Sequence, residues 1–346
     1  MRRPWVPEAP RMHVIVTEIT DSDGAVGTGF SWTPTIGPQA VAALVEHDIA
    51  PFLIGREADA ADVWEPLWRH LHEAGGGGLT TIAMAGSDLA LWDLAARRRG
   101  TSVVELLGRR HQSLPTYGSG VNLHYSLDEL AEQLQRWVDA GQPAVKIKVG
   151  SPQLQRDVER VRLAREILGE DRALMIDANQ RWDLQTAEEA ISALAEYRLE
   201  WIEEPLRADD TAGYAELSRR ITRSGPGVPI AAGENLHTRY RFAELMAADG
   251  AQVLQPNIVR VGGITPFLQI AELVADSGRR LAPHLLPDLS AQLALTLPEP
   301  VWVEDVEDAG LYEVGFLTEP SPVRIQECRA AVAPAEGLGL AFAADA

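Results

Sequence analysis

Two lysines lie two residues apart in the apolar segment 144–150, which has the sequence AVKIKVG. The segment is typical of a buried strand, and side chains at i and i+2 of a strand point to the same face. Lys146 and Lys148 therefore share a face. Two neighbouring ammonium groups repel each other and are costly to bury without a counter-charge. The spacing therefore predicts that acidic side chains face this pair.

Three acids meet that expectation, because Asp177, Glu203 and Glu234 each end a short apolar run. The successive intervals from Lys148 are 29, 26 and 31 residues, which is the length of one strand-plus-helix unit. A single acid at a strand end often caps the next helix. Three carboxylates in register cannot all ionise at one place without a cation, and ligands that are all oxygen favour Mg²⁺ over zinc. We therefore expect a Mg²⁺ site.

Short apolar runs alternate with amphipathic stretches through most of the chain, as a parallel sheet with helical crossovers requires. The predicted strands are 114–118, 144–149, 173–178, 199–203, 228–233, 252–256, 280–284 and 301–304. The predicted helices between them include 127–140, 154–168, 186–197, 240–248 and 267–277. Eight such units predict an α/β protein with a closed (β/α)₈ TIM barrel, whose active site lies at the C-terminal ends of the strands. A doubly wound open sheet is the alternative, weakened because no glycine-rich phosphate loop follows an early strand.

The first 110 residues have a different pattern. Residues 13–20 and 25–31 alternate like a β-hairpin around the turn signal at 21–24, and helical patterns follow at 39–54, 59–73 and 80–98. We expect an α+β capping domain over residues 1–112, completed by the C-terminal tail 313–346. The barrel is then the catalytic domain, over residues 113–312.

His284 ends the run 280–284, two strand–helix units after Glu234, and Glu304 lies on the last predicted strand. A lone histidine at a strand end is structural more often than catalytic. In a barrel, however, His284 lies across the lumen from Lys148, which places two proton-transfer groups on opposite faces of a bound substrate.

Composition excludes several other classes. The chain has 346 residues and a net charge of −19, which argues against nucleic acid and against an anionic membrane surface. No apolar run approaches the roughly 18 residues of a membrane span, and no apolar segment follows the basic start to make a secretory signal. The single cysteine, Cys328, excludes an intrachain disulfide and fits a reducing cytoplasm.

Several short segments together resemble the enolase superfamily, mandelate racemase subgroup, and most closely its acid-sugar dehydratases of the talarate/galactarate type. They are KIK at 146–148, DANQ at 177–180, WIEEP at 201–205, GEN at 233–235, QPN at 255–257, GGIT at 262–265 and APH at 282–284. The resemblance covers nearly the whole chain.

The resemblance implies a role for each candidate residue. Asp177, Glu203 and Glu234 hold Mg²⁺, which stabilises the enediolate formed when the α-proton leaves. Lys148 is the base on one face, and His284 is the base or general acid on the other. Four further residues are implied to support them. Lys146 lowers the pKa of Lys148 by its like charge. Polar contacts to substrate or to the metal shell are implied for Asn179, Asn257 and Glu304.

The chain departs from the subgroup in two places. Asn257 stands where the subgroup has an aspartate paired with the histidine of the next strand. An asparagine can accept a hydrogen bond from the His284 ring but brings no charge, so we expect a lower pKa for His284. The first strand of the capping domain is also expected to be missing or replaced by Met1–Pro10.

We therefore predict a Mg²⁺-dependent carbon–oxygen lyase, a dehydratase that converts a sugar acid to a 2-keto-3-deoxy acid. The alternatives are a racemase or epimerase of a 2-hydroxy acid, and a non-catalytic homologue that retains the metal site. We also expect a homo-oligomer.

Overall fold

The computed structural model describes residues 12–224 and 227–343, so the expectation about Met1–Pro10 lies outside the described residues. The cap begins with the antiparallel hairpin of β1 (His13–Thr20) and β2 (Val26–Thr33), as predicted. Asp21 closes its turn, because its Oδ1 accepts hydrogen bonds from the backbone N–H groups of Asp23 and Ala25.

Helices complete the cap, and the longest of them packs on the hairpin. They are α1 (Pro38–Leu44), the π-helical η1 (Val45–Ile49), α2 (Ala50–Leu53), α3 (Ala60–Leu71), the short η2 (His72–Ala74), α4 (Leu79–Arg97) and α5 (Val103–Leu107). The predicted helix 39–54 is thus three joined pieces with a π-helical centre. Glycine lets α4 approach β2 closely, because a Cβ at Gly29 would lie 2.1 Å from the Gly86 carbonyl oxygen.

The eight predicted barrel strands are all present, and successive strands pair in parallel from the first to the seventh. They are β3 (Leu114–Ser119), β4 (Ala144–Lys148), β5 (Ala173–Asp177), β6 (Leu199–Glu203), β7 (Ile230–Ala232), β8 (Val253–Leu254), β9 (Arg280–Leu281) and β10 (Val303–Val306). β10 pairs with β3, but no described ladder joins β9 to β10, so the hydrogen-bonded sheet is open at that seam. A side chain bridges the seam instead, since Glu304 accepts a hydrogen bond from the Leu285 backbone N–H.

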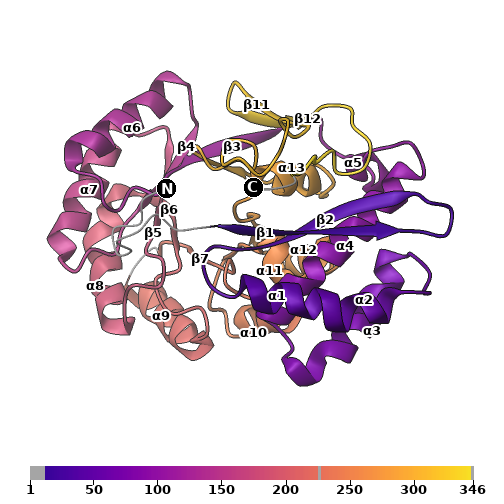
Figure 1. Ribbon diagram of the computed structural model, residues 1–346. Helices are drawn as coiled ribbons and strands as arrows, with labels where there is room; N and C mark the ends of the chain where they lie inside the picture. The colour runs from indigo at the N-terminus through magenta and orange to yellow at the C-terminus, as the bar shows by residue number, and fades with distance from the viewer. Residues whose placement is uncertain (1–11, 225–226, 344–346) are drawn as a thin grey trace.

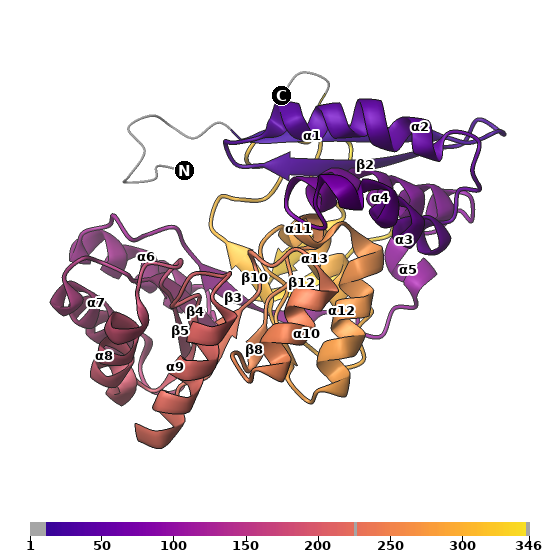
Figure 2. The same cartoon turned by 90° about the horizontal axis from the view of Figure 1, so that it is seen from below.

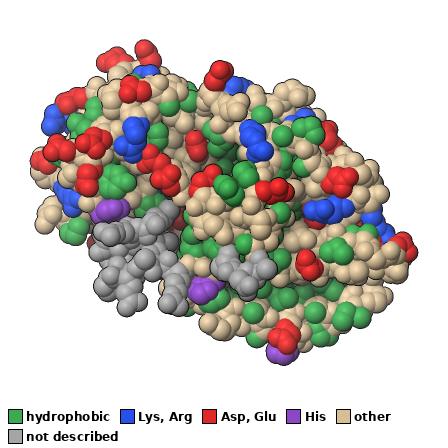
Figure 3. Space-filling model, turned by 45° about the horizontal axis from the view of Figure 1, so that its top comes forward, with side chains coloured by type: hydrophobic (Ala, Val, Ile, Leu, Met, Phe, Trp, Pro, Cys, Tyr) green, Lys and Arg blue, Asp and Glu red, His purple; other side chains and the backbone are tan. Residues whose placement is uncertain are grey.

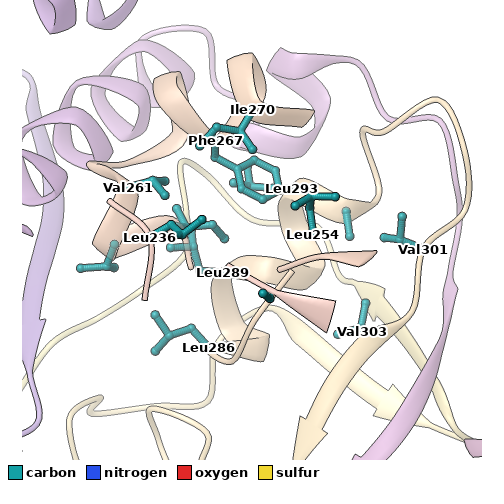
Figure 4. Close-up of a cluster of buried hydrophobic side chains, with 14 of the residues drawn as sticks. Leu236, Leu254, Val261, Phe267, Ile270, Leu286, Leu289, Leu293, Val301 and Val303 are labelled. Atoms are coloured by element: carbon teal, nitrogen blue, oxygen red, sulfur yellow. The ribbon is translucent and has the colours of Figure 1, made fainter. Parts of the chain in front are cut away.

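Helices surround these strands on the outside (Figure 1). They are α6 (Leu127–Asp139), α7 (Leu154–Leu168), α8 (Leu184–Leu194) with η3 (Ala195–Tyr197), α9 (Thr211–Ser224), α10 (Arg239–Ala247), α11 (Ile258–Val261), α12 (Ile264–Asp276) and α13 (Pro287–Ala294). Figure 4 shows Phe267 and Ile270 of α12 beside Leu293 of α13 and Leu254 of β8, all in one buried cluster. No helix within the described residues is long and apolar enough to cross a membrane.

The barrel lumen has its own small core beneath the predicted site. It consists of Tyr117, Ala144, Met175, Trp201, Ala231, Val253 and Ala282. The outward residues Val145 and Ile147 belong instead to the large core under the helices. Lys146 and Lys148 therefore face the lumen, as their spacing predicts.

The segment after residue 312, which we expect to complete the cap, divides its contacts. The hairpin of β11 (Val323–Gln326) and β12 (Arg329–Val332) extends the barrel sheet, since β12 pairs antiparallel with the start of β3. The end of the tail reaches the cap, where Leu338 N–H donates to Asp93 of α4. Figure 2 shows the cap elements lying together along one side of the barrel.

Candidate active site

Parallel pairing brings the candidate residues of β4, β5 and β6 to one level. Lys148 is in register with Asp177, and Asp177 with Glu203. Glu234 follows β7 by two residues, and His284 follows β9 by three. The predicted set therefore gathers at the C-terminal ends of the strands, where TIM barrels place their active sites.

Lys146 is the counter-charge of two buried acids. Its Nζ lies 2.8 Å from both carboxylate oxygens of Glu203 and 2.8 Å from Oε1 of Glu304, and the side chain is 1% exposed. Burial lowers the pKa of Lys146, but the charges of Glu203 and Glu304 outweigh burial and raise it well above the usual value. Lys146 is thus held as an ammonium group.

Lys148 lies further toward the mouth of the barrel, which is the end where the C-termini of the strands gather, and it is paired with Asp177. Burial has the largest single effect and lowers the pKa of Lys148, and Lys146 lowers it further, but the charges of Asp177, Glu203 and Glu234 together raise it more, so the pKa rises overall. The depression by Lys146 that we expect is present, but the nearer carboxylate outweighs it. The Lys148 backbone is also fixed, because its N–H donates to Oδ1 of Asn122 at 2.9 Å.

Two of the three predicted metal ligands, Glu203 and Glu234, lie close together beside His284, whereas Asp177 is bound by Lys148 and Asn179. One ligand atom from each of Glu203, Glu234 and His284 lies within 4.8 Å of the others. Asp177 is not in that group. Its Oδ2 is bound by Lys148 and accepts from the Asn179 side chain at 3.1 Å, and its Oδ1 accepts from the Asn179 backbone N–H at 2.7 Å. Asn179 therefore supports a predicted ligand directly.

Glu203 and Glu234 have opposite electrostatic settings. Burial raises the pKa of Glu203 to about 7, because the attraction of Lys146 only partly offsets burial and the neighbouring acids. Burial also raises the pKa of Glu234, but the charge and hydrogen bonding of His284 lower it well below its usual value. The raised pKa of Glu203 indicates that the acids at the barrel mouth repel one another more than the ammonium group of Lys146 compensates.

Asn257 contacts His284, but in the reverse sense to the prediction. Its Oδ1 accepts from the Arg260 backbone N–H at 3.1 Å, and its Nδ2 lies 3.2 Å from Nδ1 of His284. The asparagine therefore offers the ring a donor. The predicted fall in the pKa of His284 is also wrong for this arrangement: burial lowers the pKa, but Glu234 and then Glu304 raise it overall. The expected missing charge is supplied by Glu234, whose Oε2 lies 2.9 Å from Nε2 of His284.

Glu304 is fully enclosed by protein donors. Besides Lys146 and the Leu285 N–H, the Ser119 hydroxyl donates to its Oε1 at 2.8 Å. Lys146 and His284 hold the pKa of Glu304 at about 2 despite burial, which acts to raise it. In this arrangement Glu304 ties β10 to its neighbours, and the predicted contact with substrate stays a prediction.

Two buried side chains of the site were not among the predicted residues. Gln255 donates to Oε2 of Glu203 at 2.6 Å. Glu204, fully buried, accepts from both Asn235 and Gln180. A signal for Glu204 was present in the sequence, because an acid directly after a strand-end acid must point to another side of the chain. Its backbone has φ 39°, a left-handed conformation that non-glycine residues rarely adopt outside such sites.

The residues present fit a hard divalent cation. Five carboxyl groups and two ammonium groups gather here, namely Asp177, Glu203, Glu204, Glu234 and Glu304 against Lys146 and Lys148. The buried Oε2 of Glu234 lies 2.9 Å from Nε2 of the His284 ring, and within the described residues no other donor is directed at it. Carboxylate oxygens are the ligands that Mg²⁺ prefers. An excess of carboxyl groups over ammonium groups is what a magnesium site requires.

Two known families match this chain over most of its length. Residues 8–108 match the N-terminal domain of mandelate racemase / muconate lactonizing enzyme, and residues 129–346 match the family described as enolase C-terminal domain-like. The junction between the two matches falls near the start of β3.

Individual relatives agree with the family match. The chain is 36% identical to the 3,6-anhydro-alpha-L-galactonate cycloisomerase of Streptomyces coelicolor over 95% of this chain and 89% of that protein. It is 36% identical to the L-talarate/galactarate dehydratase of Salmonella typhimurium over 85% of this chain and 73% of that protein.

A solved structure resembles the whole fold. The L-talarate dehydratase of Polaromonas sp. JS666, complexed with Mg and L-glucarate, superposes with a TM-score of 0.86 at 36% identity, over 96% of this chain and 90% of that one. These matches confirm the predicted family and that the chain is an enzyme, and the magnesium in that structure agrees with the predicted cofactor. The chain belongs to the enolase superfamily, in the group of mandelate racemase and muconate lactonizing enzyme.

Proposed function

We propose that this protein is a Mg²⁺-dependent dehydratase of a sugar acid. The observation that carries the proposal is the arrangement at the barrel mouth, where Lys148 on β4 and His284 after β9 accompany the carboxylates of Asp177, Glu203 and Glu234. A carboxylate substrate in such a site loses its α-proton to a neighbouring base, with the negative charge stabilised by the cation. The dehydratases among the relatives support the same reaction class.

Each residue has a defined part in the reaction. Asp177, Glu203 and Glu234 hold Mg²⁺, which when bound offsets the negative charge on the substrate carboxylate. The Nζ of Lys148 takes the proton from C2, and the C–H electron pair forms a double bond between C1 and C2. The C1–C2 double bond then shifts to C2–C3 and re-forms the carboxylate as the bond from C3 to its hydroxyl oxygen breaks, and the hydroxyl takes a proton from solvent and leaves as water. The resulting enol takes a proton at C3 and becomes a 2-keto-3-deoxy acid.

Lys148 must be neutral to accept a proton, but the carboxylate of Asp177 beside it favours the charged form. Asp177 holds the ammonium form, whereas Lys146 favours the neutral form. A carboxylate that binds a cation has less charge to offer a neighbouring ammonium group. Ligation of Asp177 therefore favours the form of Lys148 that the reaction needs.

Cycloisomerisation is a second candidate, because relatives of similar identity are named as cycloisomerases of acid sugars. The racemase or epimerase remains the third, since it needs the same Lys148 and His284. All three begin with loss of the α-proton, and they differ in whether a C3 hydroxyl is expelled, a ring bond is broken or formed, or the proton is simply returned.

A panel of sugar acids and their anhydro and lactone forms, incubated in D₂O with Mg²⁺, tests the proposal. We expect a 2-keto acid from at least one open-chain sugar acid, with no product when EDTA replaces Mg²⁺. An isomerised product formed without loss of water would favour the cycloisomerase. Deuterium at C2 without formation of a keto acid would favour the epimerase. A properly folded, Mg²⁺-binding protein that gives none of these products would contradict the proposal and support a non-catalytic homologue.

A further inference from the structure

The Asn257 side chain lies between two groups that determine how its amide is oriented. An amide has one acceptor oxygen and one donor nitrogen, and the choice between them follows from the hydrogen bonds they make. The Arg260 backbone N–H can only donate, so the atom 3.1 Å from it must be the oxygen. The Nδ2 then faces His284, 3.2 Å from ring Nδ1 and 3.5 Å from the carbonyl oxygen of the same residue.

This orientation is held by the fold. Asn257 is fully buried and caps the N-terminus of α11, so turning its amide would remove the cap and set two donors against each other. The capping domain fixes the segment that follows. The Trp64 indole N–H donates to the Gly262 carbonyl at 2.9 Å, and Asp88 accepts from the Thr265 N–H at 3.0 Å.

We infer that Asn257 keeps the proton of the neutral His284 ring on Nε2, so that His284 donates a hydrogen bond to the substrate and does not remove its α-proton. A donor at Nδ2 requires a lone pair on Nδ1, and a neutral imidazole with a lone pair on Nδ1 has its hydrogen on Nε2. A second ring proton would have to point from Nδ1 at the amide donor.

The consequence for catalysis rests on the proposed function. If His284 cannot accept a proton at Nε2, Lys148 is the only base among the two predicted proton-transfer residues. The C2–H bond is then broken from the Lys148 face alone. The site accepts sugar acids of one configuration at C2, and racemisation through two opposed bases does not occur. His284 contributes by donating a hydrogen bond to an oxygen of the substrate, as a neutral electrophilic histidine does.

Histidine ¹⁵N spectroscopy tests the inference without any substrate. The chain has eight histidines, and the His284 signals are assigned by their loss in His284→Gln. Two-bond ¹H–¹⁵N correlations distinguish a protonated ring nitrogen from an unprotonated one. We expect His284 to show a proton on Nε2 and none on Nδ1, both in metal-free protein and with Mg²⁺.

The matched variant is Asn257→Asp, which keeps the side-chain shape and the acceptor for Arg260 N–H. Its second oxygen offers His284 an acceptor, so the ring proton should move to Nδ1. A proton on Nδ1 in the wild type, or identical His284 spectra in wild type and Asn257→Asp, would overturn the inference. The wild-type spectrum alone decides the case if the variant fails to fold.

Solvent exchange then tests the catalytic consequence separately. Wild-type protein in D₂O should exchange or dehydrate only one of two C2 epimers. The double variant Asn257→Asp/Lys148→Ala should exchange the C2 hydrogen of the epimer that the wild type leaves unchanged. The single variant Lys148→Ala should exchange the C2 hydrogen of neither epimer. Exchange at both epimers by the wild type would contradict the inference. Loss of all activity on every sugar acid would count against the proposed function, while the spectra would still decide the ring tautomer.

Discussion

Lys146 and Lys148 are neighbours on one face of β4, but they differ in their charged partners and in their exposure to solvent. Lys146 is enclosed between Glu203 and Glu304, with 1% of its side chain exposed. Lys148 has one carboxylate partner, Asp177, and 13% of its side chain reaches solvent. The inner lysine therefore balances buried charge, and the outer one is the lysine that we propose meets the substrate.

This difference predicts unequal effects on stability. Lys146→Met leaves two buried carboxylates without their counter-charge, and we expect it to lower the free energy of unfolding by roughly 3–5 kcal/mol. Lys148→Met is the matched control, and its effect should be clearly smaller, because Asp177 keeps its two hydrogen bonds from Asn179. Urea unfolding in EDTA measures both. Equal losses in the two variants would contradict the assigned roles.

At this scale the sequence predicts which residues meet, but not how each side chain is oriented. The lumen-facing lysines and the acids at the strand ends follow from strand periodicity and from the spacing of the units. The reversed amide of Asn257 does not, because it depends on the Arg260 N–H at the start of α11, a helix too short to be recognised from its sequence. Gln255 could not be separated from ordinary strand-end residues by sequence pattern alone.

At the scale of elements, α4 of the cap joins the barrel through the N-terminus of α12. Asp88, which is buried, accepts from the Thr265 N–H, and the Trp92 indole donates to the Thr265 hydroxyl at 2.9 Å. Glycine is required beside it, since a Cβ on Gly263, at φ 113°, would lie 2.3 Å from the Asp88 carboxylate. The loop after Asn257 is therefore positioned by the capping domain.

The Asp88 carboxyl should make folding depend on pH. Burial raises its pKa from 3.8 to about 7, although Thr265 and Ile264 donate hydrogen bonds that lower it. Because the folded protein binds this proton more tightly than the unfolded chain, its contribution is complete below about pH 4 and is lost as the pH rises through about 7. Asp88→Asn lacks this titration, so wild type should lose roughly 2–3 kcal/mol relative to the variant between pH 5 and pH 8.

Urea unfolding of both proteins across this pH range provides the measurement, and the difference between them removes the titration of all other groups. Parallel curves for wild type and Asp88→Asn would show that Asp88 is ionised in the folded protein throughout.

Element prediction succeeds where the pattern is long and fails where it is short. The helix α7 has the predicted bounds, because fifteen residues of amphipathic pattern specify it. The strands β8 and β9 are only two residues long, so the runs 252–256 and 280–284 overestimate them. The last residues of both runs lie beyond the assigned strands, although the His284 N–H still donates to the Pro256 carbonyl at 3.2 Å. The helix α13 is buried over its whole length and has no amphipathic period to detect.

At the scale of the whole molecule, the tail closes the structure by contacting both the barrel and the cap. The hairpin of β11 and β12 extends the sheet beside β3, and Phe342 packs on Phe30 of β2 with ring centroids 5.3 Å apart. Figure 3 shows acidic side chains spread over one face of the molecule with basic ones between them, and no basic patch gathers there.

The central claim is that the acids at the ends of β5, β6 and β7 form a magnesium site, and titration calorimetry with Mg²⁺ tests it most directly. The wild type should bind Mg²⁺, and Asp177→Asn, Glu203→Gln and Glu234→Gln should each abolish or greatly weaken binding. Glu304→Gln is the matched control, because Glu304 is buried at the same mouth but is enclosed by protein donors. It should retain Mg²⁺ binding. A wild-type protein that binds no Mg²⁺, or three variants that bind it as tightly as the wild type, would contradict the account.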